Sequence, residues 1–184
     1  MTTYPSPFGK NLNLAGFTLI ETIVVVLLIG IFAAIATPSY VSWYQTKKLD
    51  DALIQVDGAI REARHEAKES GQGCTVTINT GTGIISATTN SSTPSNCLPT
   101  GNRNLNNIAS ELRLSTDFIS PSPKPLEFDY LNFSANEGVI VIYEPNTNRQ
   151  RCLVVSAGPG LIRTGFYQGN PNNPTVSNCN RNQP

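Results

Sequence analysis

Residues 16–36 read GFTLIETIVVVLLIGIFAAIA, and this stretch decides how the rest of the chain is organised. No side chain from Ile23 to Ala36 is polar, and only two threonines and Glu21 interrupt the 20 residues from Phe17 to Ala36. Twenty residues of α-helix rise about 30 Å, the thickness of the hydrocarbon core of a bilayer. A single segment in lipid must satisfy its own backbone hydrogen bonds, which only a helix does. We therefore expect a membrane-spanning helix here.

An ordinary secretory signal peptide is the alternative interpretation of this stretch. Lys10 would supply its basic region, and Ala-Ile-Ala at residues 34–36 would supply its cleavage site. Two features argue against it: residues 1–16 form a polar segment with two prolines, and Glu21 places a carboxylate inside the apolar run. Insertion scales give a cost of about 2.5–3.5 kcal/mol for a charged side chain at the bilayer centre. Even near one end of the segment, Glu21 requires a partner.

Residues 16–21, GFTLIE, followed by an apolar helix, resemble the N-terminal signature of type IV prepilins and type II secretion pseudopilins. The resemblance implies that a dedicated membrane peptidase cuts after Gly16 and methylates the new N-terminal Phe17. Residues 1–16 would then be a leader peptide, longer than many in the family. The resemblance further implies that Glu21, the fifth mature residue, pairs with the N-terminal amine of a neighbouring subunit during assembly.

The same resemblance implies the partners and the location of the chain. Residues 17–38 would be the transmembrane and filament-core helix, and Pro38 lies where many pilins carry a helix-kinking proline. The partners would be other pilin or pseudopilin subunits, the prepilin peptidase, an inner-membrane assembly platform and membrane lipid. We expect a single-pass protein of the bacterial inner membrane, with its C-terminal domain outside the cytoplasm, that enters a pilus or pseudopilus after assembly.

The pattern after Pro38 is that of a helix with one apolar face. Apolar or small residues recur every three or four positions, and charged residues occupy the opposite face. Asp57 and Arg61 are spaced for an i,i+4 pair, and Ser70-Gly71 offers a stop. We predict one helix over residues 17–69, about 80 Å long and kinked at Pro38, whose second part, within residues 39–70, backs onto a globular domain. The predicted buried stripe is Leu49, Leu53, Val56, Ile60, Ala63 and Ala67.

Residues 71–184 have the residue pattern of a β-rich domain. Short runs of β-branched and aromatic residues alternate with turn residues such as Thr80-Gly81 and Pro145-Asn146. The predicted fold class is α+β, a long N-terminal helix packed on an antiparallel sheet or small sandwich. Residues 108–114 fit a strand or a helix, and residues 90–107 and 115–125 are predicted loops. The predicted strands are 74–79, 83–88, 126–133, 138–143, 149–156 and 161–166.

The four cysteines, Cys74, Cys97, Cys152 and Cys179, contain no Cys-x-x-Cys pair that would indicate zinc or a thioredoxin-like site. Disulfides form outside the cytoplasm, and four cysteines allow three connectivities. We favour Cys74 with Cys97, which would close the loop after the first hairpin, and Cys152 with Cys179. The second bridge would anchor the Asn-rich tail, residues 168–184. Each would contribute about 3 kcal/mol in the chain-entropy model. No metal or other cofactor is expected.

Four segments of the β-rich domain look like the C-terminal pattern of the H-type minor pseudopilins and their minor-pilin relatives. Residues 63–67 resemble the end of the first helix in the same family. The resemblance implies a helix packed on two β-sheets and a low-abundance subunit near the filament tip. The segments are LEF at 126–128, GVIVI at 138–142, RCLVVS at 151–156 and GLIR at 160–163.

The net charge of the chain limits which classes of molecule it can bind. Lysine plus arginine and aspartate plus glutamate number 13 each, which excludes a globally basic nucleic-acid binder. Residues 145–184 nevertheless carry four arginines and no acid. DNA capture for uptake, which some H-type relatives perform, is therefore the alternative function, through phosphate contacts that salt should weaken. The candidate DNA-binding residues are Arg149, Arg151, Arg163 and Arg181.

Catalysis has little support in the sequence. His65 is the only histidine and lies on the charged face of the predicted helix, so a Ser-His-Asp scheme has no other base. Gly158-Pro159-Gly160 lacks the Gly-Lys-Ser/Thr of a phosphate loop and is predicted to be a tight turn. An anchored exported enzyme using Glu127 and Asp129 is the weakest alternative. The leading hypothesis is a non-enzymatic subunit of either a type IV pilus or a secretion pseudopilus, lifted into the filament by a separate ATPase.

Overall fold

The computed structural model describes residues 16–91, 95–118, 125–145 and 147–181. The chain divides into two compact units, Met1–Ser42 and Trp43–Pro184, which we call the anchor and the head. Residues 1–15, which include Lys10 and most of the predicted leader, lie outside the described residues, as does Asn146 of one predicted turn.

Helix α1 (Leu19–Glu69) is the single long helix that the sequence predicts. It begins two residues later than predicted, because Thr18 is its N-cap: the Thr18 hydroxyl accepts a hydrogen bond from the Glu21 backbone N–H at 3.3 Å. The helix continues through Pro38. It ends at Ser70-Gly71 as predicted, since Gly71 has a φ of 66° and Ser70 N donates to Glu66 O at 2.9 Å.

The predicted apolar stripe of α1 is confirmed in the head. Five of its six members are fully buried and Leu53 is partly buried. Ala52 and Ala59 are also fully buried and widen the stripe on the same face. Small side chains at these positions let the helix lie close to the strands behind it. The fully buried members are Leu49, Val56, Ile60, Ala63 and Ala67.

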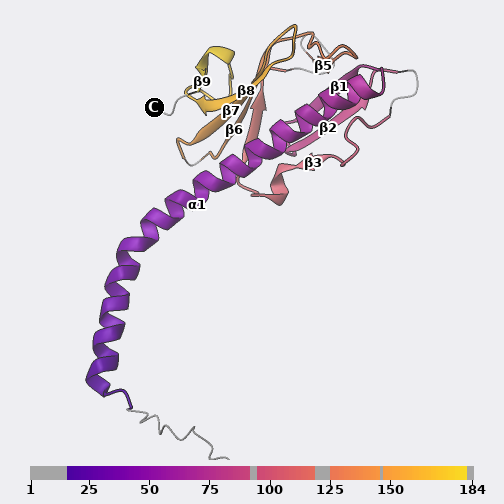
Figure 1. The fold of residues 1–184 in the computed structure, drawn as a ribbon. Helices are drawn as coiled ribbons and strands as arrows, with labels where there is room; N and C mark the ends of the chain where they lie inside the picture. Colours follow the sequence, from indigo (N-terminus) through magenta and orange to yellow (C-terminus); the bar gives the residue numbers. More distant parts are fainter. Residues whose placement is uncertain (1–15, 92–94, 119–124, 146, 182–184) are drawn as a thin grey trace, which may run out of the picture. The chain divides into compact units, whose positions relative to one another are not determined.

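The head contains two antiparallel sheets that share a core with the second half of α1 (Figure 1). The predicted fold class is therefore confirmed. The first sheet has the order β3-β2-β1-β5, formed by Arg103–Asn104, Ile84–Thr89, Cys74–Asn79 and Leu126–Phe128. The second has the order β4-β6-β7-β8-β9, formed by Arg113–Thr116, Gly138–Tyr143, Gln150–Val155, Ile162–Tyr167 and Cys179–Asn180.

Several predicted boundaries are wrong for local reasons. Strand β5 stops at Phe128 instead of 133, because the Asp129 carboxylate accepts hydrogen bonds from the backbone of Leu131 and Phe133 and holds a loop. The predicted loop 90–107 contains β3 and the short helix η1 (Leu105–Asn107). Strand β4 extends to Thr116, into the predicted loop 115–125, of which residues 119–124 lie outside the described residues.

Strands β6 and β7 are buried on both faces, which gives the head two cores. Ile140, Ile142 and Leu153 face the main core beneath α1. The alternate residues of the same strands face a second, smaller cluster with Tyr167 and Cys179. The Asn-rich tail covers this outer face: η2 (Val176–Asn178) leads into β9, which pairs with β8.

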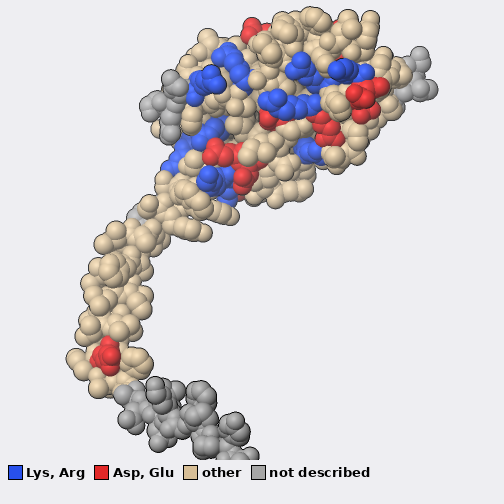
Figure 2. All heavy atoms as spheres, viewed as in Figure 1, with Lys and Arg blue, Asp and Glu red and all other residues tan. Residues whose placement is uncertain are grey.

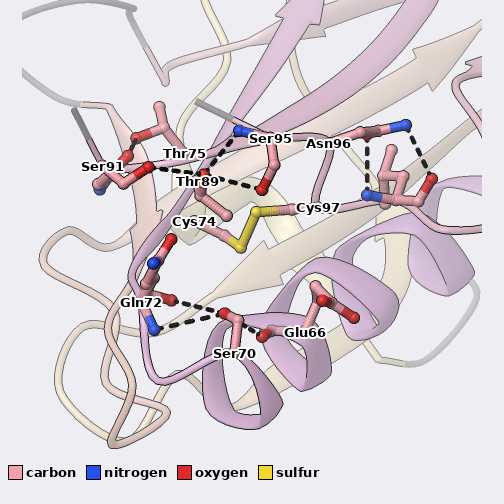
Figure 3. Close-up of a disulfide and its surroundings, with 12 residues drawn as sticks. Glu66, Ser70, Gln72, Cys74, Thr75, Thr89, Ser91, Ser95, Asn96 and Cys97 are labelled. Atoms are coloured by element: carbon pink, nitrogen blue, oxygen red, sulfur yellow. Dashed lines mark hydrogen bonds between the residues drawn. A yellow bond between two sulfur atoms is a disulfide. The ribbon is translucent and has the colours of Figure 1, made fainter. Parts of the chain in front are cut away.

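Both cysteine pairs that the sequence favoured are bonded in the structure, Cys74 to Cys97 and Cys152 to Cys179. Figure 3 shows the first bridge near the end of α1, joining the start of β1 to the loop after β2. Buried Thr89 fixes that loop by accepting a hydrogen bond from Ser95 N at 2.8 Å. The second bridge joins β7 to the tail. Among the described residues, the buried hydrophobic ones all lie between Leu49 and Cys179, so the core of the head is formed by residues of the head itself.

Candidate assembly site

The candidate site is the start of α1: Gly16 and Phe17 lie just before the helix, and Glu21 lies in its first turn. Gly16 is exposed, and no atom lies within 4 Å of the position that a Cβ would take there. Phe17 is 79% exposed. The segment therefore presents an accessible backbone on both sides of the predicted cleavage position, as a peptidase substrate must.

Thr18 and Glu21 have the spacing of a capping box, Thr-x-x-Glu. The structure shows the half in which Thr18 caps the Glu21 N–H. A carboxylate in the first turn also faces the positive end of the helix dipole. The sequence prediction treated Thr18 only as an interruption of the apolar run, although the capping-box spacing was the signal that identifies its role.

The other threonines of the apolar segment satisfy their hydroxyls within the helix. Thr22 Oγ1 donates to Leu19 O at 2.8 Å, and Thr37 Oγ1 donates to Ala33 O at 2.6 Å. Within the described residues the Glu21 carboxylate makes no hydrogen bond or ion pair. Glu21 is thus the one side chain of the segment whose charge the helix leaves unneutralised.

The apolar side chains of the anchor are exposed along the whole segment. Thirteen large ones, from Phe17 to Ile35, are between 45% and 79% exposed. Burial of such side chains stabilises by about 1.5–3 kcal/mol each, so the segment gains tens of kcal/mol in an apolar environment. Among the described helices, α1 contains a window long and apolar enough to cross a membrane, and none of that window is buried.

The four candidate DNA-binding arginines have different partners. Arg151 and Arg181 both line a hollow that also contains Asp50. Arg149 donates to Gln45 Oε1 at 3.0 Å, and Arg151 donates to Asp50 Oδ1 at 2.7 Å while stacking over Phe166. Both therefore bind α1. Arg163 and Arg181 line a hollow of about 510 Å³ beside β8 and β9. Figure 2 shows the Lys and Arg side chains in separate groups over the head, with acidic side chains between several of them.

The Arg151–Asp50 pair carries a testable stability prediction. The Arg151 side chain is 11% exposed and that of Asp50 is 35% exposed, so water screens the pair incompletely. Asp50→Asn should lower the free energy of unfolding of the head by about 1–2 kcal/mol, since the guanidinium loses its charged acceptor. Urea denaturation of both single variants and of the double variant with Arg151→Ala measures the coupling. If the losses of unfolding free energy in the two single variants simply add up in the double variant, the Arg151–Asp50 pair does not stabilise the head.

Glu62 forms a second link between α1 and the head. Its carboxylate accepts from Thr100 N and Thr100 Oγ1 and pairs with Arg103 at 2.6 Å. Burial raises the pKa of Glu62, but the hydrogen bonds from Thr100 and the charge of Arg103 outweigh burial, and the pKa lies below its ordinary value. The side chain is only 18% exposed.

The lowered pKa of Glu62 predicts how the stability of the head depends on pH. Because the folded pKa lies below the unfolded one, the carboxylate stabilises the fold above the unfolded pKa. This contribution disappears as the pH falls through the folded pKa. Glu62→Gln should therefore cost stability at pH 7 and flatten the loss between about pH 5 and pH 3. Urea midpoints of both proteins at these pH values measure the difference; parallel pH curves would exclude the role of Glu62.

Most of the other polar residues considered in the sequence analysis make hydrogen bonds or ion pairs within the head. The predicted pair of Asp57 and Arg61 is present, with Nε–O distances of 2.8 and 2.9 Å. Arg64, predicted on the solvated face, instead donates to the carbonyls of Pro159 and Gly160 and holds the predicted tight turn against α1. Glu127 accepts from Thr75 at 3.1 Å, and Asp129 is occupied by its loop. His65 is exposed.

One comparison with known proteins concerns the N-terminal segment. Residues 13–37 match the family model of the prokaryotic N-terminal methylation motif. No curated protein matches the chain significantly. The chain is similar to the solved structure of the minor pseudopilin EpsH from the type 2 secretion system of Vibrio cholerae, at 18% identity and a TM-score of 0.46, over 71% of this chain and 96% of that one. It is also similar to the type IV minor pilin FimU of Pseudomonas aeruginosa, at 15% identity and a TM-score of 0.49, over 68% and 92%.

The matched motif covers the exposed apolar start of α1. It includes Phe17, the Glu21 carboxylate and the large apolar side chains up to Ile35, all of which are exposed. The chain therefore carries the prokaryotic N-terminal methylation motif on a helix whose first part is apolar and long enough to cross a membrane.

Proposed function

We propose that the chain is a minor subunit of a type IV pilus or type II secretion pseudopilus, cut after Gly16 and methylated on Phe17. The observation that carries the proposal is the lone Glu21 carboxylate in the first turn of an exposed apolar helix that matches the methylation motif. Loss of the leader creates an amine on Phe17, four positions before Glu21, in every subunit. A neighbour's amine then neutralises a carboxylate that would otherwise be buried alone.

The two disulfides support the proposed location. Both join residues that are buried in the head, and such bridges persist in oxidising compartments. The anchor would remain in the inner membrane, surrounded by lipid, with the head on the far side from the cytoplasm. The prepilin peptidase and the assembly platform would then act on α1 in the membrane, and a separate ATPase would supply the energy.

The place near the filament tip follows from the H-type resemblance. The segments that carry it form β5, at the edge of the first sheet, and β6, β7 and the start of β8, the inner strands of the second sheet. A tip subunit should be present in few copies per filament. Quantitative mass spectrometry of purified filaments measures this, and a copy number equal to that of the major subunit would refute the minor role.

DNA capture is the less favoured function. With Arg149 and Arg151 bound to α1, the candidate set is reduced to Arg163 and Arg181. Two phosphate contacts give a salt slope of only about −1.8, too small for strong non-specific binding. The filament role requires no such patch.

The experiment that tests the proposed function is the intact mass and N-terminal sequence of the protein from the membrane fraction. We expect a chain that begins with methylated Phe17 and gains four mass units on reduction, because each of two disulfides takes up two hydrogens. A chain that begins at Thr37 would mean cleavage by signal peptidase after Ala36. The assembly role of Glu21 would then be wrong.

A further inference from the structure

Two large aromatic side chains lie on α1 where the head does not yet cover the helix. Trp43 and Tyr44 are 54% and 49% exposed. Leu49, five residues after Tyr44, is the first fully buried residue of α1. The head by itself therefore leaves much of both aromatic surfaces in water, an arrangement that apolar groups of this size avoid unless another phase or molecule covers them.

Two lysines follow these aromatic residues on α1, and one of them contacts the Tyr44 ring. Lys47 is exposed, and Lys48 lies over the Tyr44 ring at 4.9 Å from its centroid while pairing with Glu111. Arg149 reaches the same part of the helix through Gln45. Aromatic rings followed by lysine are the composition found at membrane–water interfaces, where the rings lie at the headgroup level and the ammonium group contacts lipid phosphates.

The anchor has the length that such an interface requires. Glu21 and Tyr40 are separated by 19 positions, a rise of about 28 Å along the helix. The side chains that the structure describes between them are exposed, and they are apolar apart from Ser39 and the internally bonded Thr22 and Thr37. The length of this segment is thus close to the thickness of a hydrocarbon core, about 30 Å. Trp43 and Tyr44 follow Tyr40 in sequence, within the next turn.

We propose that Trp43, Tyr44 and Lys47 bind the headgroup layer of the bilayer and set the depth at which the chain waits before assembly. The proposal rests on the proposed function, since it requires the anchor to lie in a membrane. The exposed ring surfaces of Trp43 and Tyr44 lie among the lipid headgroups, and the exposed Lys47 pairs with lipid phosphate. With its depth set at this edge, the helix keeps Glu21 at the opposite edge, where water reaches the carboxylate.

Trp43 is the only tryptophan in the chain and reports on its own surroundings. The full chain is reconstituted in vesicles of phosphatidylcholine and phosphatidylglycerol whose acyl chains carry bromine at a shallow or a deep position. We expect shallow bromine to quench Trp43 more strongly than deep bromine or aqueous acrylamide. Quenching chiefly by acrylamide would overturn the proposal. So would protection from all quenchers that grows with the protein-to-lipid ratio, which would mean that a second copy covers Trp43.

Two matched variants calibrate the measurement. Both carry Trp43→Phe; one adds Phe32→Trp inside the apolar segment, and the other adds Ile54→Trp at an exposed position of the head. The first should respond to deep bromine and the second to acrylamide. If the Phe32→Trp reporter also escapes lipid quenchers, the membrane location required by the proposed function fails. If the Phe32→Trp reporter responds to deep bromine but Trp43 is quenched by acrylamide like the Ile54→Trp reporter, only the proposed contact of Trp43 with the headgroups is wrong.

A second comparison tests whether these residues set the depth. The Phe32→Trp reporter is measured with Phe at position 43 and Tyr44 intact, and again with Trp43→Ala and Tyr44→Ala. Removing both rings should change the depth of the Phe32→Trp reporter in the bilayer. Each residue by which the helix slides along its axis corresponds to about 1.5 Å. The alanine changes lie on exposed positions, so the core of the head stays intact. An unchanged depth profile would show that the aromatic pair does not set the depth.

Discussion

Glu21→Gln is expected to remove the protein from filaments while leaving it processed and in the membrane. Glutamine keeps the size of the side chain but cannot neutralise the N-terminal amine of a neighbouring subunit. Breaking one partner of a buried ion pair costs about 3–5 kcal/mol, which corresponds to a decrease of at least about 100-fold in incorporation. The measurement is the ratio of sheared filament to membrane-bound protein, in cells that produce the other subunits.

Two matched variants separate charge from packing. Glu21→Asp keeps the charge on a shorter side chain and should assemble at an intermediate level. Thr22→Val lies one residue further on and removes a hydroxyl that already bonds within the helix, so it should assemble nearly normally. An N-terminal sequence beginning at Phe17 in every variant excludes a processing defect. Normal incorporation of Glu21→Gln would refute the proposed pairing.

Replacing Cys152 and Cys179 with alanine is expected to lower the Tm of the head by about 9 °C. The bridge closes a loop with a sequence separation of 27, for which the chain-entropy model gives about 3 kcal/mol. For a domain of this size, 1 kcal/mol corresponds to roughly 3 °C. Alanine suits these positions because both cysteines are buried, and a serine hydroxyl would need a partner there. Calorimetry of the unit Trp43–Pro184 measures the change.

Two controls make this second result specific. Removing Cys74 and Cys97, which are 23 positions apart, should cost a similar free energy but leave the tail paired to β8. Limited proteolysis should therefore cut near residues 168–181 faster only in the Cys152/Cys179 variant, because that bridge holds the tail over the second core. A Tm equal to that of the unmodified head would show that the tail is held by packing alone.

The local patterns of this chain are largely determined by its sequence. The apolar run, the Gly16–Phe17 pair and Glu21 are contiguous, so the helix and the motif that predicts its processing are formed by residues that are neighbours in the chain. The 3.6-residue period placed Leu49, Val56 and Ile60 on one face, and the structure buries all three. The strands that were predicted accurately, such as β1 and β6, are short runs bounded by turn residues.

Only the tertiary structure shows the features that depend on contacts between segments distant in the sequence. Arg151 is indistinguishable from Arg163 by sequence, yet it forms an ion pair with Asp50 across 101 positions. Strand β9 is two residues of an Asn-rich tail without apolar alternation, and it forms because Cys179 is bonded to β7 and pairs with Tyr167. A periodic pattern reports which face of an element is apolar. It does not report which distant residue lies opposite, because that is fixed only when the sheets close around the core.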